Sequence, residues 1–113
     1  MNPHDVPTAA QLVESVREWL MRDVIPGTSG RLSFHARVAA NVLAMVEREL
    51  ELGPDQSAAH AARLAQLGVA DDAELAAAIR DGRLDDRMDE VRALVRASVD
   101  DKLAVANPKY AVR

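Results

Sequence analysis

The chain has 113 residues, of which 49% are hydrophobic and only 3% aromatic, so one domain with a core of Ala, Val and Leu is expected. The formal net charge is −4, with 14 basic and 18 acidic residues. Because the charges are interspersed, no basic surface for nucleic acid is predicted.

The first predicted helix runs from Pro7 or Thr8 to about Val24. Thr8, followed three residues later by Gln11, is the signature of a capping box at a helix start. The apolar residues share one stripe of a helical wheel, as packing on a core requires: Leu12, Val13, Val16, Trp19, Leu20 and Val24. The run of Pro, Gly, Thr and Ser at 26–30 then ends the helix.

Two further helices are predicted on either side of a Gly–Pro pair. The second spans about 32–51 and ends at Gly53 and Pro54, because proline lacks the amide hydrogen that a helix interior needs. The third spans about 55–67 and stops at Gly68, a residue type that accepts the left-handed conformation.

The last two helices are marked by acidic residues at their starts. Asp71 with Glu74 predicts the cap of a short fourth helix that ends at Gly82. The fifth begins after Asp85 and Asp86, and stops where Asn107 and Pro108 follow Ala106.

These elements predict an all-α fold. No segment shows the alternation of a strand, and short connections favour antiparallel neighbours. We expect residues 1–113 to form a single domain, a compact bundle of about five helices with a short fourth one. No stretch suits a membrane span or a secretion signal, so a soluble cytoplasmic protein is expected.

The second helix carries polar residues that a plain core does not need. His35 lies near the middle of its apolar arc, and Glu49 lies within that arc. Arg37, Asn41 and Arg48 follow one another at spacings of four and seven along the arc's edge. Such a stripe is suited to a carboxylate, a phosphate or an acidic partner surface.

Each of these residues also has a structural interpretation. His35 suits a core position with a hydrogen bond to a backbone carbonyl, and the arginines suit ion pairs with nearby acids. Asp23 lies within the apolar stripe of the first helix near its C-terminal end, where the helix dipole disfavours a negative charge. It therefore predicts a buried ion pair with Arg37, or with His35.

The sequence disfavours a conventional enzyme. It has no cysteine, no glycine-rich phosphate loop and no glycine-flanked serine elbow. His4 and Asp5 are adjacent, but no histidine has a ligand three or four residues away on its helix, so no metal and no cofactor are expected. His35 and Glu49 are about 20 Å apart along their helix and cannot act as a pair.

Three segments together resemble a known family. They are residues 4–8 (His-Asp-Val-Pro-Thr), 31–43 with its continuation Arg48-Glu49-Leu50, and the closing Lys102-Leu103 with Asn107-Pro108-Lys109-Tyr110. The chain resembles an uncharacterised bacterial family of small helical proteins, a domain of unknown function typically encoded beside aminoglycoside-phosphotransferase-like kinases and acyl-CoA dehydrogenases. The resemblance implies an accessory role beside those enzymes and assigns no catalytic residue.

We therefore expect a noncatalytic accessory or interaction protein whose partner is such a kinase or dehydrogenase. Its contact surface would combine Arg37, Asn41 and Arg48 with Asn107 and Tyr110. The alternative is a small-molecule binding module for an acyl-CoA or a phosphorylated acyl intermediate, in which Arg37 and Arg48 hold phosphate and His35 orients the ligand. Self-association stays open if the apolar arc of the second helix exceeds what the other helices cover.

Overall fold

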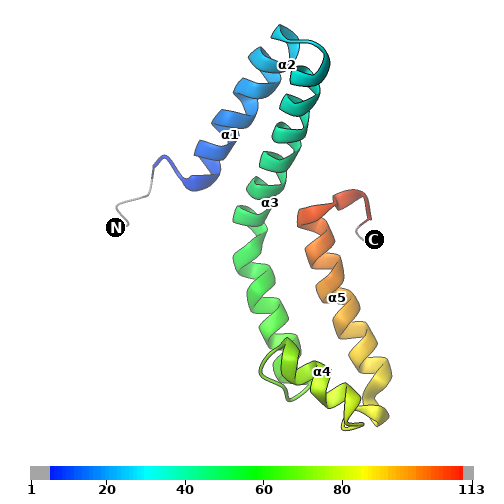
Figure 1. The fold of residues 1–113 in the computed structure, drawn as a ribbon. Helices are drawn as coiled ribbons and strands as arrows, with labels where there is room; N and C mark the ends of the chain where they lie inside the picture. The colour runs from blue at the N-terminus through cyan, green and yellow to red at the C-terminus, as the bar shows by residue number, and fades with distance from the viewer. Residues whose placement is uncertain (1–5, 111–113) are drawn as a thin grey trace. The chain divides into compact units, whose positions relative to one another are not determined.

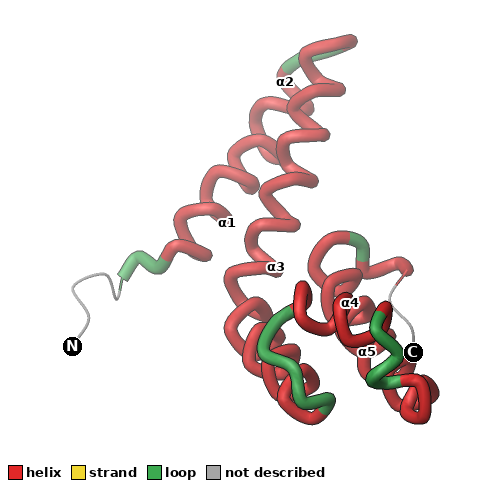
Figure 2. The backbone as a smooth tube through the Cα atoms, turned by 60° about the horizontal axis from the view of Figure 1, so that its bottom comes forward, coloured by secondary structure: helices red, strands yellow, loops and turns green. Residues whose placement is uncertain are grey.

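The computed structural model describes residues 6–110, and within that range the chain forms helices without strands (Figures 1 and 2). The predicted all-α class is confirmed. The chain divides into two compact units, Met1–Leu52 and Gly53–Arg113. Each unit has its own pattern of burial.

The first unit is a helical hairpin. Helix α1 (Ala9–Trp19) continues through a π-helical segment (Leu20–Val24) into the short helix α2 (Ile25–Gly27). The predicted capping box is confirmed, because the Gln11 amide donates to the Thr8 hydroxyl at 3.1 Å and the Thr8 amide donates to the Gln11 side chain at 2.8 Å. The chain then turns back into α3 (Gly30–Gln66).

The turn of the hairpin is held by two hydroxyls and one glycine. Thr28 donates to the Val24 carbonyl at 2.6 Å, and Ser33 donates to the Ile25 carbonyl at 3.1 Å. Gly30 begins α3 with a φ of 61°, in the left-handed region that side chains with a Cβ avoid. These contacts bring α1 against the first half of α3.

The expected break at Gly53 and Pro54 is wrong, because α3 is continuous over 37 residues and contains Pro54. The expected five-helix bundle is corrected to four main helices, α1, α3, α4 (Asp72–Arg80) and α5 (Met88–Ala106), among the described residues. Proline removes one helical hydrogen bond but already has a helical φ. The good helix formers before Gly53 and after Ser57 therefore carry the helix through the poorer ones around Pro54.

Replacing Pro54 with alanine tests this continuity. If the helix runs through residue 54, Pro54→Ala restores an amide donor and removes a steric clash, a gain of about 3 kcal/mol in helix interiors. Alanine also gives the unfolded chain more conformational entropy than proline does, which offsets about 1 kcal/mol of this gain. We expect a net rise of about 1–2 kcal/mol in the free energy of unfolding, measured by urea denaturation. A loss of stability would instead indicate a turn at this position.

The second unit contains the hydrophobic core. The C-terminal part of α3, helix α4 and helix α5 enclose a cluster of buried apolar side chains, with Met88 and Leu94 packed against it: Leu64, Leu67, Val69, Leu75, Ala78, Leu84 and Val91. Gly68 and Gly82 have φ values of 78° and 80° and allow the tight turns that close the cluster. The predicted cap of α4 is confirmed, since Asp71 accepts from the Glu74 amide at 2.8 Å.

The described part of the first unit, residues 6–52, has no comparable core. Ala36 and Ala40, exposed by 7% and 4%, are its only buried residues within the described range. Several large apolar side chains that were predicted to face a core are more than half-exposed on both of its helices, among them Trp19, Phe34 and Val42. Two helices alone cannot cover their own apolar faces, and small alanines fill the seam between them.

Candidate functional site

The residues predicted on the second helix lie along the part of α3 in the first unit, mostly on its surface. His35 is exposed, not a core residue, and its ring meets the edge of Phe34 with centroids 5.5 Å apart. Arg37, Asn41 and Glu49 are also exposed. Arg48 is half-buried. On a helix of about 100° per residue, Arg37 and His35 point to nearly opposite sides.

The predicted buried ion pair is wrong. Asp23 lies in the π-helical segment and is exposed, as is Arg37. Within the described residues no ion pair joins them. Since water solvates both side chains, neither needs the other to offset a desolvation cost.

The ion pair that the hairpin does form was not predicted. Arg17 of α1 meets Glu47 of α3 through two hydrogen bonds, one of them from its outer nitrogen at 3.3 Å. Both side chains are largely buried, and the hydrogen bond from Arg17 to Glu47 raises the pKa of Arg17 above its usual value. A forked contact of this kind fixes how α1 lies along α3.

Asn107 and Tyr110, the other predicted contact residues, lie in the second unit. Asn107 is half-buried and ends α5, where its amide donates to the Leu103 carbonyl at 2.7 Å. Tyr110 belongs to the 3-10 turn Pro108–Tyr110. His4 and Asp5, which the sequence places side by side, lie outside the described residues.

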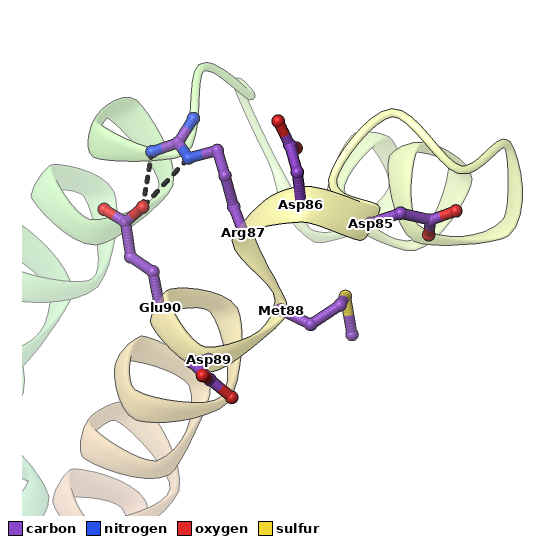
Figure 3. Close-up of a pocket in the computed structure, with 6 residues that line it drawn as sticks. All are labelled: Asp85, Asp86, Arg87, Met88, Asp89 and Glu90. Carbon is purple, nitrogen blue, oxygen red and sulfur yellow. Dashed lines mark hydrogen bonds and ion pairs between the residues drawn. The ribbon is translucent and has the colours of Figure 1, made fainter.

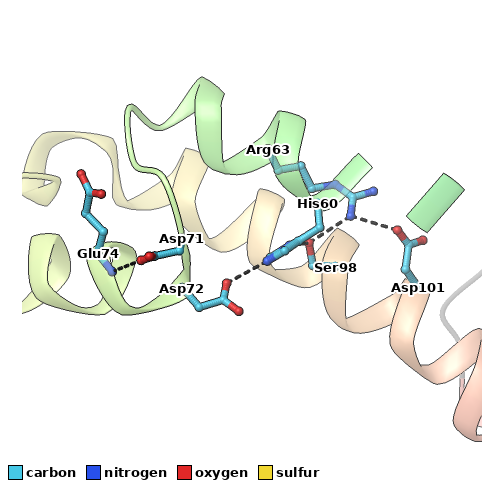
Figure 4. Close-up of polar contacts among 7 residues, drawn as sticks. All are labelled: His60, Arg63, Asp71, Asp72, Glu74, Ser98 and Asp101. Atoms are coloured by element: carbon cyan, nitrogen blue, oxygen red, sulfur yellow. Dashed lines mark hydrogen bonds and ion pairs between the residues drawn. The ribbon is translucent and has the colours of Figure 1, made fainter. Parts of the chain in front are cut away.

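The richest polar arrangement in the described chain lies in the second unit (Figure 4). We call it the polar cluster: His60, Arg63, Asp72, Ser98 and Asp101. The two ring nitrogens of His60 lie 2.7 Å from the Ser98 hydroxyl and 2.7 Å from a carboxylate oxygen of Asp72. Arg63 donates to Ser98 at 3.0 Å and to Asp101 at 2.9 Å. The cluster therefore ties α3 to both α4 and α5.

One proton arrangement satisfies every contact. If Nε2 of His60 carries the proton, it donates to Asp72 and leaves Nδ1 to accept from the Ser98 hydroxyl. The Ser98 oxygen then accepts from Arg63. Each donor has an acceptor, as a stable polar contact between helices requires.

The order Asp, His, Ser is also that of a hydrolytic triad, but other features of a hydrolase are missing around Ser98. It lies inside α5, where neighbouring amides are engaged in the helix and cannot form an oxyanion hole. A surface depression that could take a substrate lies away from Ser98, at residues 85–90 around the start of α5. We interpret the polar cluster as a structural contact that holds α3, α4 and α5 together. In the sequence, the spacing of three residues within His60 and Arg63 and within Ser98 and Asp101 places each pair on one helix face, but it does not indicate that the two pairs meet.

A shallow open depression lies at the start of α5, lined by residues 85–90 (Figure 3). Arg87 donates to Glu90 at 2.9 Å, and Gln66 donates to the other oxygen of Glu90 at 2.9 Å. The hydrogen bonds from Gln66 and Arg87 hold the pKa of Glu90 below its usual value. Within the described residues, no three histidine or acidic side chains come close enough to hold a metal ion.

A family model described as a domain of unknown function, DUF6285, matches residues 26–110. The chain belongs to this family. The match covers α3, α4 and α5 and starts after α1. Comparisons with curated proteins and with solved structures find no match. Among the described residues, no helix is long and apolar enough to cross a membrane.

Proposed function

We propose that this protein is a noncatalytic accessory or interaction protein, and that its helical hairpin is the part that contacts a partner. The observation that carries the proposal is the unequal burial of the two units. The second unit encloses a hydrophobic core, whereas the hairpin buries only two alanines in its described part.

The hairpin exposes more large apolar side chains than scattered surface residues would explain. On α1 they include Leu12, Val16 and Trp19, which are spaced to share one face. Contiguous apolar surface of this kind, bordered by polar groups, is typical of protein interaction sites. Trp19 is the residue type that most often dominates binding energy at an interface.

The polar stripe of Arg37, Asn41 and Arg48 borders the apolar side chains of α3. Guanidinium groups at the rim of an apolar surface favour partners with acidic rims and speed up association. Asn107 and Tyr110 belong to the other unit, and we leave them out of this surface. The kinases and acyl-CoA dehydrogenases that the family resemblance implies are the partners we propose.

Binding of an acyl-CoA or a phosphorylated acyl intermediate is the less favoured alternative. His35 and Arg37 lie on nearly opposite sides of α3, so one small ligand cannot contact both. The depression at the start of α5 is lined by four acidic residues, Asp85, Asp86, Asp89 and Glu90, which repel phosphate. A thermal shift of several degrees with saturating acyl-CoA would favour this alternative over the interaction protein.

Isothermal titration of the full chain against each proposed partner enzyme tests the interaction. We expect binding with a Kd of about 10 µM or tighter to one of them. Trp19→Ala should weaken it about tenfold or more, whereas Val99→Ala, which changes an exposed residue of the second unit, should leave it unchanged. Absence of binding to both enzymes at about 100 µM would contradict the proposal.

A further inference from the structure

One apolar stripe of α3 points away from α1. Phe34, Val38, Val42 and Met45 follow spacings of four, four and three residues and so share a face of the helix. All four are exposed, Phe34 by 61% and Val42 by 51%. The buried residues Ala36 and Ala40 lie about half a turn away, on the side of the helix where Glu47 contacts Arg17 of α1. Helix α1 therefore leaves this stripe uncovered.

The stripe is nearly symmetric about residue 40. Val38 and Val42 lie two residues before and after it, and Phe34 and Met45 lie six before and five after. An antiparallel helix of the same sequence, centred at the same residue, would set Val38 against Val42 and Phe34 against Met45. Each large side chain would then meet another across a two-fold axis, as a self-complementary interface requires.

Two charges in line with the stripe, one beyond each of its ends, have the same symmetry. Arg31 and Glu49 lie nine residues before and after residue 40, and their separation of 18 residues places them at the same angle on the helix. Both are exposed, and neither joins an ion pair within the described residues. Antiparallel pairing would bring each Arg31 to the partner's Glu49, two ion pairs at once.

We propose that a second copy of this chain covers the stripe, with the two α3 helices antiparallel and crossing near residue 40. The antiparallel direction also sets opposite helix dipoles side by side. Asn41 borders the stripe one residue from the centre, where its amide meets the other copy's amide and fixes the register, as a single buried asparagine does in helical dimers. The dimer contact takes up Asn41 and the apolar side chains of α3, and it leaves the apolar face of α1 for the partner enzyme.

Sedimentation of the protein alone, without a partner enzyme, tests the dimer. We expect the chain to dimerise with a Kd in the range of about 1–50 µM. Val38→Asp places two charges near the centre of the contact and should leave a monomer at about 100 µM. Because Val38 is exposed, the Val38→Asp variant should keep the helical circular dichroism of the wild-type protein. A wild-type chain that is monomeric at about 100 µM overturns the proposal.

Charge reversal tests the antiparallel register. In the dimer, either Arg31→Glu or Glu49→Arg alone places side chains of like charge against each other at both ends of the contact. Each single variant should therefore weaken dimerisation about tenfold or more. The double variant Arg31→Glu/Glu49→Arg should restore the wild-type Kd within about threefold. Glu51→Arg, an exposed acid on the other side of α3, is the matched control and should have no effect. Equal losses in the two single variants and the double variant would refute this register.

Discussion

Leu67→Ala is expected to lower the free energy of unfolding by about 2–5 kcal/mol, as removal of buried leucine side chains does in packed cores. Leu67 is only 4% exposed and lies in the cluster formed by α3, α4 and α5. The substitution removes apolar contacts and leaves a cavity that the neighbouring helices cannot fill completely. Urea denaturation followed by circular dichroism measures the loss.

Leu12→Ala is the matched control for this effect. It removes the same atoms from α1, where Leu12 is 55% exposed. We expect the free energy of unfolding to change by less than about 1 kcal/mol, because water already surrounds most of the Leu12 side chain. Similar losses in the two variants would contradict the unequal burial of the two units, and with it the basis of the proposed interaction surface.

Arg63→Met is expected to cost about 1–2 kcal/mol of stability in the second unit, a range that allows for partial solvent exposure of charged hydrogen bonds. Arg63 is 21% exposed at its side chain and holds Ser98 and Asp101 of α5. Methionine retains most of the apolar stem, so the change isolates the polar contacts. Thermal unfolding should show a lower midpoint.

Arg83→Met gives the comparison for the polar cluster. Its side chain is 56% exposed and contacts Asp81 at 3.4 Å, only two residues away. We expect Arg83→Met to lower the free energy of unfolding by less than about 0.5 kcal/mol. A double-mutant cycle of Arg63→Met with Asp101→Leu should yield a coupling energy near 1 kcal/mol. A coupling near zero would mean that the two side chains do not hold α5 to α3.

Local signals in the sequence predicted the local structure well. The capping box of Thr8 and Gln11 and the cap at Asp71 are formed as expected, because a cap depends on residues within one turn. The left-handed Gly68 is also confirmed. Pro54 is the exception, since its cost of one hydrogen bond is set against the helix-forming tendency of the residues on both sides.

Burial, in contrast, could not be predicted from local signals in the sequence. The helical wheel identified the apolar faces of α1 and α3, but it cannot say which face another element covers. Ala36 and Ala40 are buried against α1, whereas Phe34 remains exposed, because close approach of two helices selects small residues. His35, expected in a core, is therefore at the surface, and Asp23 needs no buried partner.

The sequence by itself determined that this chain is helical, where its caps lie and which residues line each apolar face, because these properties depend on neighbours a few positions away. Only the tertiary structure decided that the core lies in the second unit and that His60, Arg63 and Ser98 meet. Those outcomes depend on which helices pack together over separations of more than thirty residues. No local pattern specifies that choice.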